Sequence, residues 1–71
     1  MELFEVNEQT RLRREAAAER LRELADMLSR HNEVTFQREG LRYSVRVPDE
    51  VDFKLEIEVG SESEIEIEIS W

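Results

Sequence analysis

The sequence contains no cysteine, one proline, two glycines, one histidine and one lysine among its 71 residues. Without cysteine there is no disulfide framework and no zinc or redox site of the cysteine type. No apolar run approaches the roughly 20 residues that a membrane-spanning helix needs, and residues 1–6 are too few and too acidic for a signal peptide. We therefore expect one cytoplasmic domain over residues 1–71, near the lower size limit for folding on a single hydrophobic core.

Negative charge is concentrated in the last third of the chain. The formal net charge is −8, yet residues 1–48 hold nine acidic and nine basic side chains and are neutral. Residues 49–71 hold nine acidic side chains against Lys54 alone. This balance disfavours nucleic acid and anionic membranes as partners. Nine of the ten bases are arginines, and an acidic, arginine-rich composition is typical of a salt-adapted or GC-rich source, because concentrated salt screens crowded charges.

Residues 11–31 carry the apolar spacing of an amphipathic helix. No glycine or proline interrupts this segment, Thr10 is placed to cap its start, and Asn32 is a suitable residue to end it. The apolar stripe consists of Ala17, Leu21, Leu24, Ala25 and Leu28.

Alternation of apolar and polar residues predicts strands in the rest of the chain. The predicted strands are Leu3–Val6, Glu33–Arg38, Leu41–Val47, Val51–Val59 and Ile65–Trp71. Glu39-Gly40 is a two-residue hairpin signal, and looser turns follow at 48–50 and 60–64. Since Trp71 is the only tryptophan and closes an unbroken alternation, we expect it to be held in the core.

Loop lengths predict how these strands pair. The two-residue loop places Phe36 opposite Tyr43, and the three-residue loop after it places Val45 opposite Phe53. The last loop places Phe53 opposite Trp71. Each apolar position then meets another, which supports this register because a one-residue slip would turn a whole strand over. The prediction is an α+β fold of order β-α-β-β-β-β, an antiparallel meander sheet with one amphipathic helix packed on one face.

The predicted register brings four carboxylates together on the polar face, with Glu56 opposite Glu68 and Glu58 opposite Glu66. Directly opposed like charges destabilise a sheet. The patch is therefore a solvated face, a docking face for a basic partner, or a site for Ca²⁺ or Mg²⁺. We prefer the solvated face, because charge runs usually are solvated. The four glutamates stay weak metal candidates, and we assign no catalytic or cofactor-binding residue.

For the basic side chains we also prefer structural roles to functional ones. Cross-strand surface pairs are predicted for Arg42 with Glu56 and for Arg46 with Asp52. Three arginines lie at the positive end of the helix dipole: Arg11, Arg13 and Arg14. They either form an anion-binding site or, in the interpretation we prefer, fold back on the acidic strands.

The aromatic residues and the single histidine do not indicate a catalytic or metal-binding site. Tyr43 and Trp71 fall on the apolar face, where core packing is the expected role. His31 stands at the predicted helix end, and a single histidine without cysteine is poor support for a metal site or a catalytic triad.

Several motifs together resemble the amphi-Trp domain family, small prokaryotic proteins named for an amphipathic segment that ends in tryptophan. The matching segments are Arg14–Ala17, Leu21–Asp26, Val47–Val51 and Glu66–Trp71. Leu12 departs from the family pattern, which favours a small hydroxylic residue there. The resemblance covers nearly the whole chain and implies a fold, with no catalytic or binding residues.

One helix about 10–12 Å across is too narrow for a sheet of four or five strands spaced about 4.8 Å apart. A strongly twisted sheet can curl around the helix and hide the remaining apolar surface, which gives a monomer. Otherwise the uncovered apolar sheet marks an interface, and we prefer this second interpretation. We therefore expect a non-enzymatic protein-interaction or assembly module that binds a second copy or another protein and needs no cofactor. The alternatives are a charge-display protein of a salt-adapted cell without a dedicated ligand and, ranked lower, a divalent-cation-binding protein.

Overall fold

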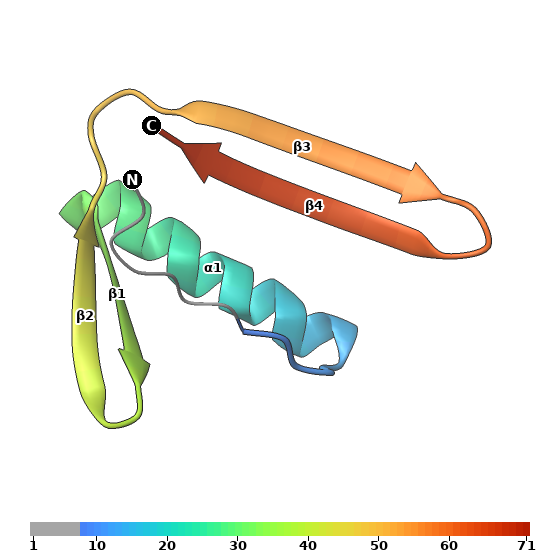
Figure 1. The fold of residues 1–71 in the computed structure, drawn as a ribbon, viewed down its shortest axis with the longest axis horizontal. Coiled ribbons are helices and arrows are strands. Elements are labelled where there is room, and N and C mark those ends of the chain that lie inside the picture. The colour runs from blue at the N-terminus through green and yellow to red at the C-terminus, as the bar shows by residue number, and fades with distance from the viewer. Residues whose placement is uncertain (1–7) are drawn as a thin grey trace.

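The computed structural model describes residues 8–71. One helix is followed by two antiparallel hairpins (Figure 1), so the α+β class and the antiparallel strands are confirmed. The elements are α1 (Arg14–His31), β1 (Glu33–Arg38), β2 (Leu41–Arg46), β3 (Asp52–Val59) and β4 (Ser63–Ser70). The strand predicted at residues 3–6 lies outside the described residues.

The helix α1 begins three residues later than its apolar spacing predicts. Arg13 occupies the N-cap with extended backbone and makes no side-chain cap hydrogen bond, so the prediction that Thr10 caps the helix is wrong. The amide of Ala17 donates to the carbonyl of Arg13 at 3.0 Å and closes the first turn. At the other end Asn32 adopts the left-handed conformation with φ 43°, as expected for a residue that ends a helix.

The β1–β2 hairpin has the predicted register. Glu39 and Gly40 turn the chain with φ values of 53° and 79°, the positive angles that a two-residue hairpin loop requires. Phe36 lies opposite Tyr43. Their rings stack with centroids 5.3 Å apart and planes 16° from parallel.

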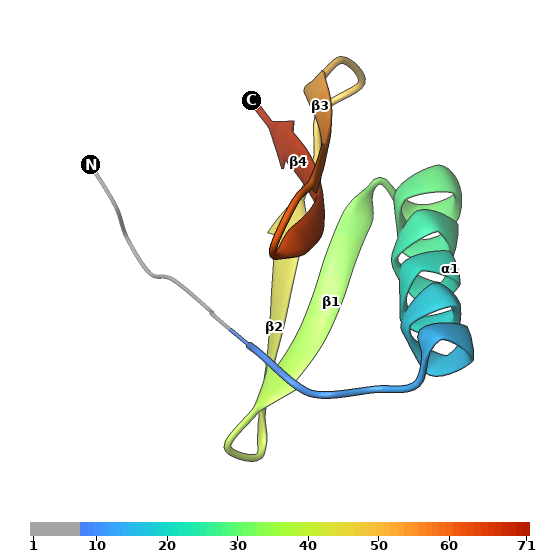
Figure 2. The ribbon, with the colours of Figure 1, turned by 90° about the vertical axis from the view of Figure 1, so that its right-hand side faces the viewer.

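The helix packs on β1, where the amide of Thr35 approaches the Sδ atom of Met27 at 3.4 Å. The amide of Val47 donates to the carbonyl of Asn32 at 2.9 Å and continues the β1–β2 ladder by one pair. Figure 2 shows α1 alongside β1, in a different layer from the β3–β4 hairpin.

Val47, 8% exposed, is the single buried residue among residues 8–71, so the core of one chain is very small.

The β3–β4 hairpin is shifted by two residues from its predicted register. Phe53 lies opposite Ile69, where Trp71 was expected. The loop consists of the three residues 60–62, two fewer than predicted, and the tighter loop allows a longer ladder from Asp52–Ser70 to Val59–Ser63. Because a shift of two keeps every side chain on its face, the apolar face predicted for this hairpin is preserved.

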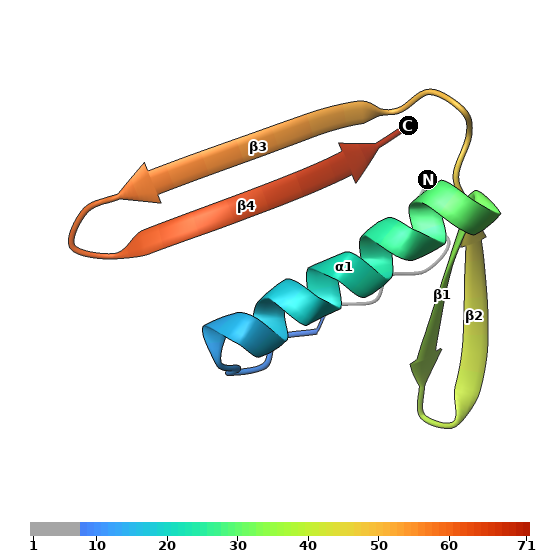
Figure 3. The same cartoon turned by 180° about the vertical axis from the view of Figure 1, so that it is seen from behind.

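A continuous four-stranded meander does not form within the chain. The strands make two separate two-stranded sheets, and Val45 of β2 does not face Phe53 of β3. The connection 47–51 instead leads β3 away at a wide angle to β2 (Figures 1 and 3). The amide of Val47 still bonds the carbonyl of Asn32 in the β1–β2 register, so the chain leaves the first hairpin only after Val47. The β3–β4 hairpin therefore projects from the helix and the first hairpin.

Candidate functional site

The most exposed apolar surface in the described chain is one face of the β3–β4 hairpin. We call it the hairpin apolar face; it consists of Phe53, Leu55, Ile57, Val59, Ile65, Ile67, Ile69 and Trp71. Its exposure is largest at the far end of the hairpin, where Val59 is 81% and Ile65 is 70% exposed. Near the helix Ile67 is 43% exposed and Ile69 is half-buried. A face of this kind is typical of a surface that another molecule covers.

The near end of this face borders an apolar cavity of about 370 Å³. The cavity is lined by α1, both strands of the first hairpin and the last residues of the chain. Leu21 and Leu24 come from the helix, Val45 from β2, and Ile69 and Trp71 from the β4 end. No backbone of β3 or β4 approaches α1 closely, so the cavity is an open groove between the projecting hairpin and the rest of the described chain.

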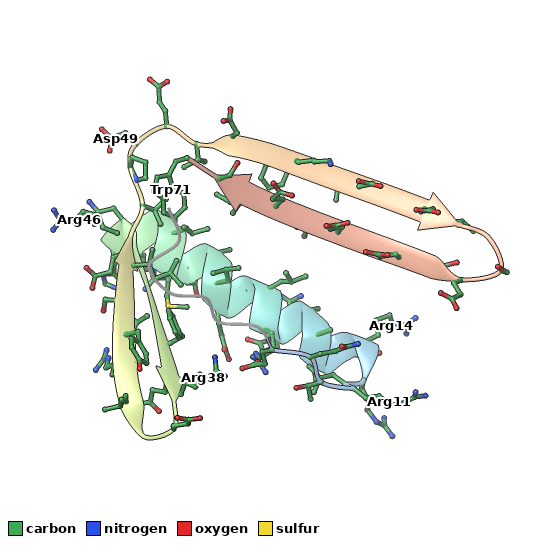
Figure 4. All side chains as sticks on the ribbon, viewed as in Figure 1. Arg11, Arg14, Arg38, Arg46, Asp49 and Trp71 are labelled. Atoms are coloured by element: carbon green, nitrogen blue, oxygen red, sulfur yellow. The ribbon has the colours of Figure 1, made fainter. Side chains whose placement is uncertain are left out.

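The role predicted for Trp71 is wrong in the single chain. We expected core packing, but Trp71 lies just beyond the β4 ladder and is 61% exposed (Figure 4). Tyr43 does face inward and is half-buried against Phe36. Alternation along the chain predicted the correct face for both aromatics, but it carries no information about which other element covers that face.

Carboxylates line the opposite face of the same hairpin. The shifted register puts Glu56 opposite Glu66 and Glu58 opposite Glu64, which corrects the predicted partners Glu68 and Glu66. Two directly opposed glutamate pairs therefore remain in the ladder.

Lys54 relieves part of this charge. It lies opposite Glu68, and its Nζ atom is 3.4 Å from a carboxylate oxygen of Glu56 on the same strand. All these side chains are exposed. In the described part of the chain, no group of three or more acidic, histidine or cysteine side chains is arranged to hold a metal ion.

Two arginines of β2 do not meet the acidic strand that was predicted to pair with them. Arg42 lies opposite Gln37 and Arg46 opposite Glu33, so the predicted pairs with Glu56 and Asp52 are wrong within one chain. Neither arginine forms an ion pair with a residue in 8–71. Both remain positive side chains on a strand with an open edge.

The arginines at the start of α1 do not fold back on the acidic strands, contrary to the interpretation we preferred. Arg14 pairs with its neighbour Glu15 at 3.2 Å, and its side chain is 92% exposed. Arg11 and Arg14 point outward from the start of the helix (Figure 4). Arg20, further along α1, pairs with Glu8 rather than with the strands.

His31 lies at the last position of α1, beside a polar hollow of about 650 Å³. The hollow is lined by the end of the helix and by residues 47–49. His31 is exposed, and no second histidine exists in the sequence. Asp49 also lines the hollow and is exposed.

Sequence reasoning missed the importance of the connection 47–51. Val47 is the buried anchor of this segment, and Pro48 follows it without an amide hydrogen to donate. The proline after an alternating segment was the signal available, although it was interpreted as an ordinary turn.

One amphipathic helix followed by two antiparallel hairpins, with an apolar face that ends at a tryptophan, defines a small α+β domain. No helix within residues 8–71 combines the length and apolar character needed to cross a membrane. The sequence profile of the Amphi-Trp domain matches residues 1–71. The chain belongs to the Amphi-Trp domain family, as its motifs indicated. No match was found among curated proteins or among solved structures.

Proposed function

We propose that this chain is a non-enzymatic protein-interaction or assembly module whose binding surface is the hairpin apolar face. The observation that carries this proposal is the exposure of that face: Phe53 is 64% and Val59 is 81% exposed in the single chain. Soluble monomers seldom expose contiguous apolar patches beyond a few hundred Å². Composition supports the non-enzymatic part, because one histidine and no cysteine leave few groups for nucleophilic or acid–base chemistry.

The solvent-accessible surface area of the chain is larger than a compact protein of its mass should have, which supports the existence of a binding partner. A compact protein of 8.5 kDa is expected to expose about 4700 Å², whereas this chain exposes 7134 Å². Residues 1–7 contribute at most about 1200 Å², the area of an unfolded chain of their mass. The remaining excess of about 1200 Å² exceeds the roughly 800 Å² that each partner buries in a standard interface.

Burial of the hairpin apolar face supplies a sufficient driving force. Covering one large aliphatic side chain contributes about 1.5–3 kcal/mol. Association costs an estimated 4–15 kcal/mol in lost freedom of motion. The free energy gained by burying the eight side chains of the hairpin apolar face reaches or exceeds this cost, whereas burial of a few scattered side chains does not.

Charge display is the second candidate, and the opposed pairs Glu56–Glu66 and Glu58–Glu64 favour it. These glutamates face solvent on the side opposite the hairpin apolar face. An acidic outer face keeps an assembled protein soluble and discourages further edge-to-edge association. The two functions are therefore compatible, and charge display alone leaves the apolar face unexplained.

Sedimentation velocity over a concentration series, at low and high salt, tests the assembly function. We expect an assembled species whose dissociation constant rises about tenfold or more in Ile65→Gln, since each 1.4 kcal/mol lost changes affinity tenfold. Glu64→Gln is the matched control, because it makes a neighbouring change of similar size on the opposite face. If the chain stays monomeric at high micromolar concentration and binds no protein partner, charge display becomes the better explanation.

A further inference from the structure

On the basis of the assembly function proposed above, we propose that two copies of this chain exchange their β3–β4 hairpins. In this dimer β3 of one copy pairs antiparallel with β2 of the other. Each β1–β2 hairpin is thereby extended by the partner's β3–β4 hairpin into a four-stranded sheet. The hairpin apolar face of one copy then continues the sheet face on which the other copy's α1 packs.

Open strand edges are the first observation behind this pairing. Within the described chain, β2 is paired only with β1, and β3 only with β4. No backbone of the β3–β4 hairpin approaches β1, β2 or α1. Among residues 8–71, the outer edges of β2 and β3 therefore have no strand partner, and an open edge of this kind is a template for pairing with another chain.

Two-fold symmetry makes this pairing reciprocal. When Ser44 of one copy lies opposite the partner's Lys54, Lys54 lies opposite the partner's Ser44, so the two copies form two equivalent β2–β3 ladders. The same register places Val45 opposite the partner's Phe53, so apolar side chains again meet apolar ones.

Charge complementarity identifies a second copy as the occupant of the β2 edge. The register places Arg46 opposite the partner's Asp52 and Arg42 opposite the partner's Glu56. Neither arginine has an ion-pair partner among residues 8–71, and Arg46 points away from its own β3 (Figure 4). Cross-strand pairs of opposite charge stabilise a sheet, and these pairs also select the register.

The connection 47–51 explains why exchange replaces closure within one chain. Val47 still bonds Asn32 in the register of β1 and β2, and Pro48 follows directly with a fixed φ. Beyond Val47 the chain leaves β2 in a direction that carries β3 away from the free edge of its own β2 (Figure 1). A short hinge that resists turning back is the usual origin of an exchanged element. Leu21 of α1, 50% exposed in one chain, is then available to the partner's hairpin.

Disulfide trapping tests the exchange directly, because the chain has no cysteine of its own. Ser44→Cys and Lys54→Cys are prepared as separate chains, unfolded together, refolded as a mixture and oxidised. Directly opposed residues in an antiparallel pair have Cα atoms about 4.5–5.5 Å apart, within the range of a disulfide. We expect a covalent heterodimer on a non-reducing gel, and no covalent dimer from either variant alone. Circular dichroism of each variant checks that it folds.

Gln37→Cys mixed with Lys54→Cys is the matched control. Gln37 is exposed on β1, one strand further from the partner's β3, so its distance exceeds the roughly 7 Å limit for a disulfide. A dimer in sedimentation that gives no Ser44–Lys54 crosslink overturns the exchange and leaves the assembly function standing. A Ser44→Cys, Lys54→Cys double variant that crosslinks only within one chain also overturns the exchange. A monomer at high micromolar concentration overturns the exchange, and it overturns the interaction function as well only if the chain also binds no protein partner.

Discussion

Phe53 of β3 lies opposite Ile69 of β4, and this pair sets the register of the whole projecting hairpin. The pair leaves Trp71 beyond the end of the ladder and brings Glu56 opposite Glu66. The two-residue shift thus decides both that Trp71 has no partner in the ladder and which carboxylates repel one another.

The opposed glutamates predict a salt-dependent stability. Glu64→Gln with Glu66→Gln removes the repulsion of both opposed pairs, each of which costs about 0.2–1 kcal/mol. We expect Tm at low salt to rise, by about 4–8 °C for each kcal/mol recovered in a domain of this size. We also expect the further gain from added NaCl to shrink, because less repulsion remains to be screened. Thermal unfolding followed by circular dichroism at fixed protein concentration measures both effects.

Glu68→Gln is the control for this experiment. Glu68 lies opposite Lys54, so its neutralisation removes an attraction rather than a repulsion. We expect it to leave Tm at low salt unchanged or slightly lower. An equal rise of Tm in the control would show that total charge, and not the opposed pairs, limits stability.

Divalent cations are expected to stabilise the chain no more than NaCl does at the same ionic strength. Successive outward residues of a strand are about 6.8 Å apart, whereas Ca²⁺ needs six to eight oxygens at 2.3–2.6 Å. One opposed pair such as Glu58 and Glu64 therefore supplies too few ligands. Thermal unfolding in micromolar CaCl₂ or MgCl₂ tests this expectation, and a rise of several degrees specific to one cation would contradict it.

The start of α1 predicts a stabilising substitution. Arg13 holds the N-cap without a side-chain hydrogen bond, and its positive charge opposes the helix dipole. Arg13→Ser supplies a hydroxyl that accepts a bond from a free amide, and we expect a gain of about 0.5–2 kcal/mol in unfolding free energy. Arg11→Ser removes the same charge two residues before the cap. An equal gain from that control would assign the effect to charge alone.

The β1–β2 turn predicts a loss and a gain at neighbouring positions. Gly40 has φ 79°, and although an added Cβ meets no atom within 4 Å, Gly40→Ala puts a side chain into a disfavoured backbone conformation. We expect it to lower the unfolding free energy by about 1–2 kcal/mol. Glu39→Asn places a residue that tolerates φ 53° at the other turn position, and we expect a gain of a few tenths of a kcal/mol. Urea unfolding of the two variants measures both changes.

Local signals in the sequence predicted most of the elements correctly. The period of the apolar residues distinguished the helix from the strands, and Glu39-Gly40 fixed the β1–β2 register. These features depend on neighbours in the chain, so a single sequence contains them. The start of α1 and the length of the 60–62 loop were predicted less well, because an uncapped helix end and a glycine loop are each compatible with several boundaries.

Strand alternation assigns Phe53 and Trp71 to the same side in either register, so the order of residues is enough to specify which side chains share a face. What covers that face depends on how elements far apart in the chain are placed. After Val47, whose amide still bonds Asn32 in the β1–β2 register, the connection carries the chain away from β2, and the direction of a connection leaves no periodic trace in the sequence. Pairing of β2 with β3 depends on that direction, because a ladder forms only where two edges meet. For this reason the alternation is visible in the printed residues, while the open edges and the exposed hairpin apolar face appear only in three dimensions.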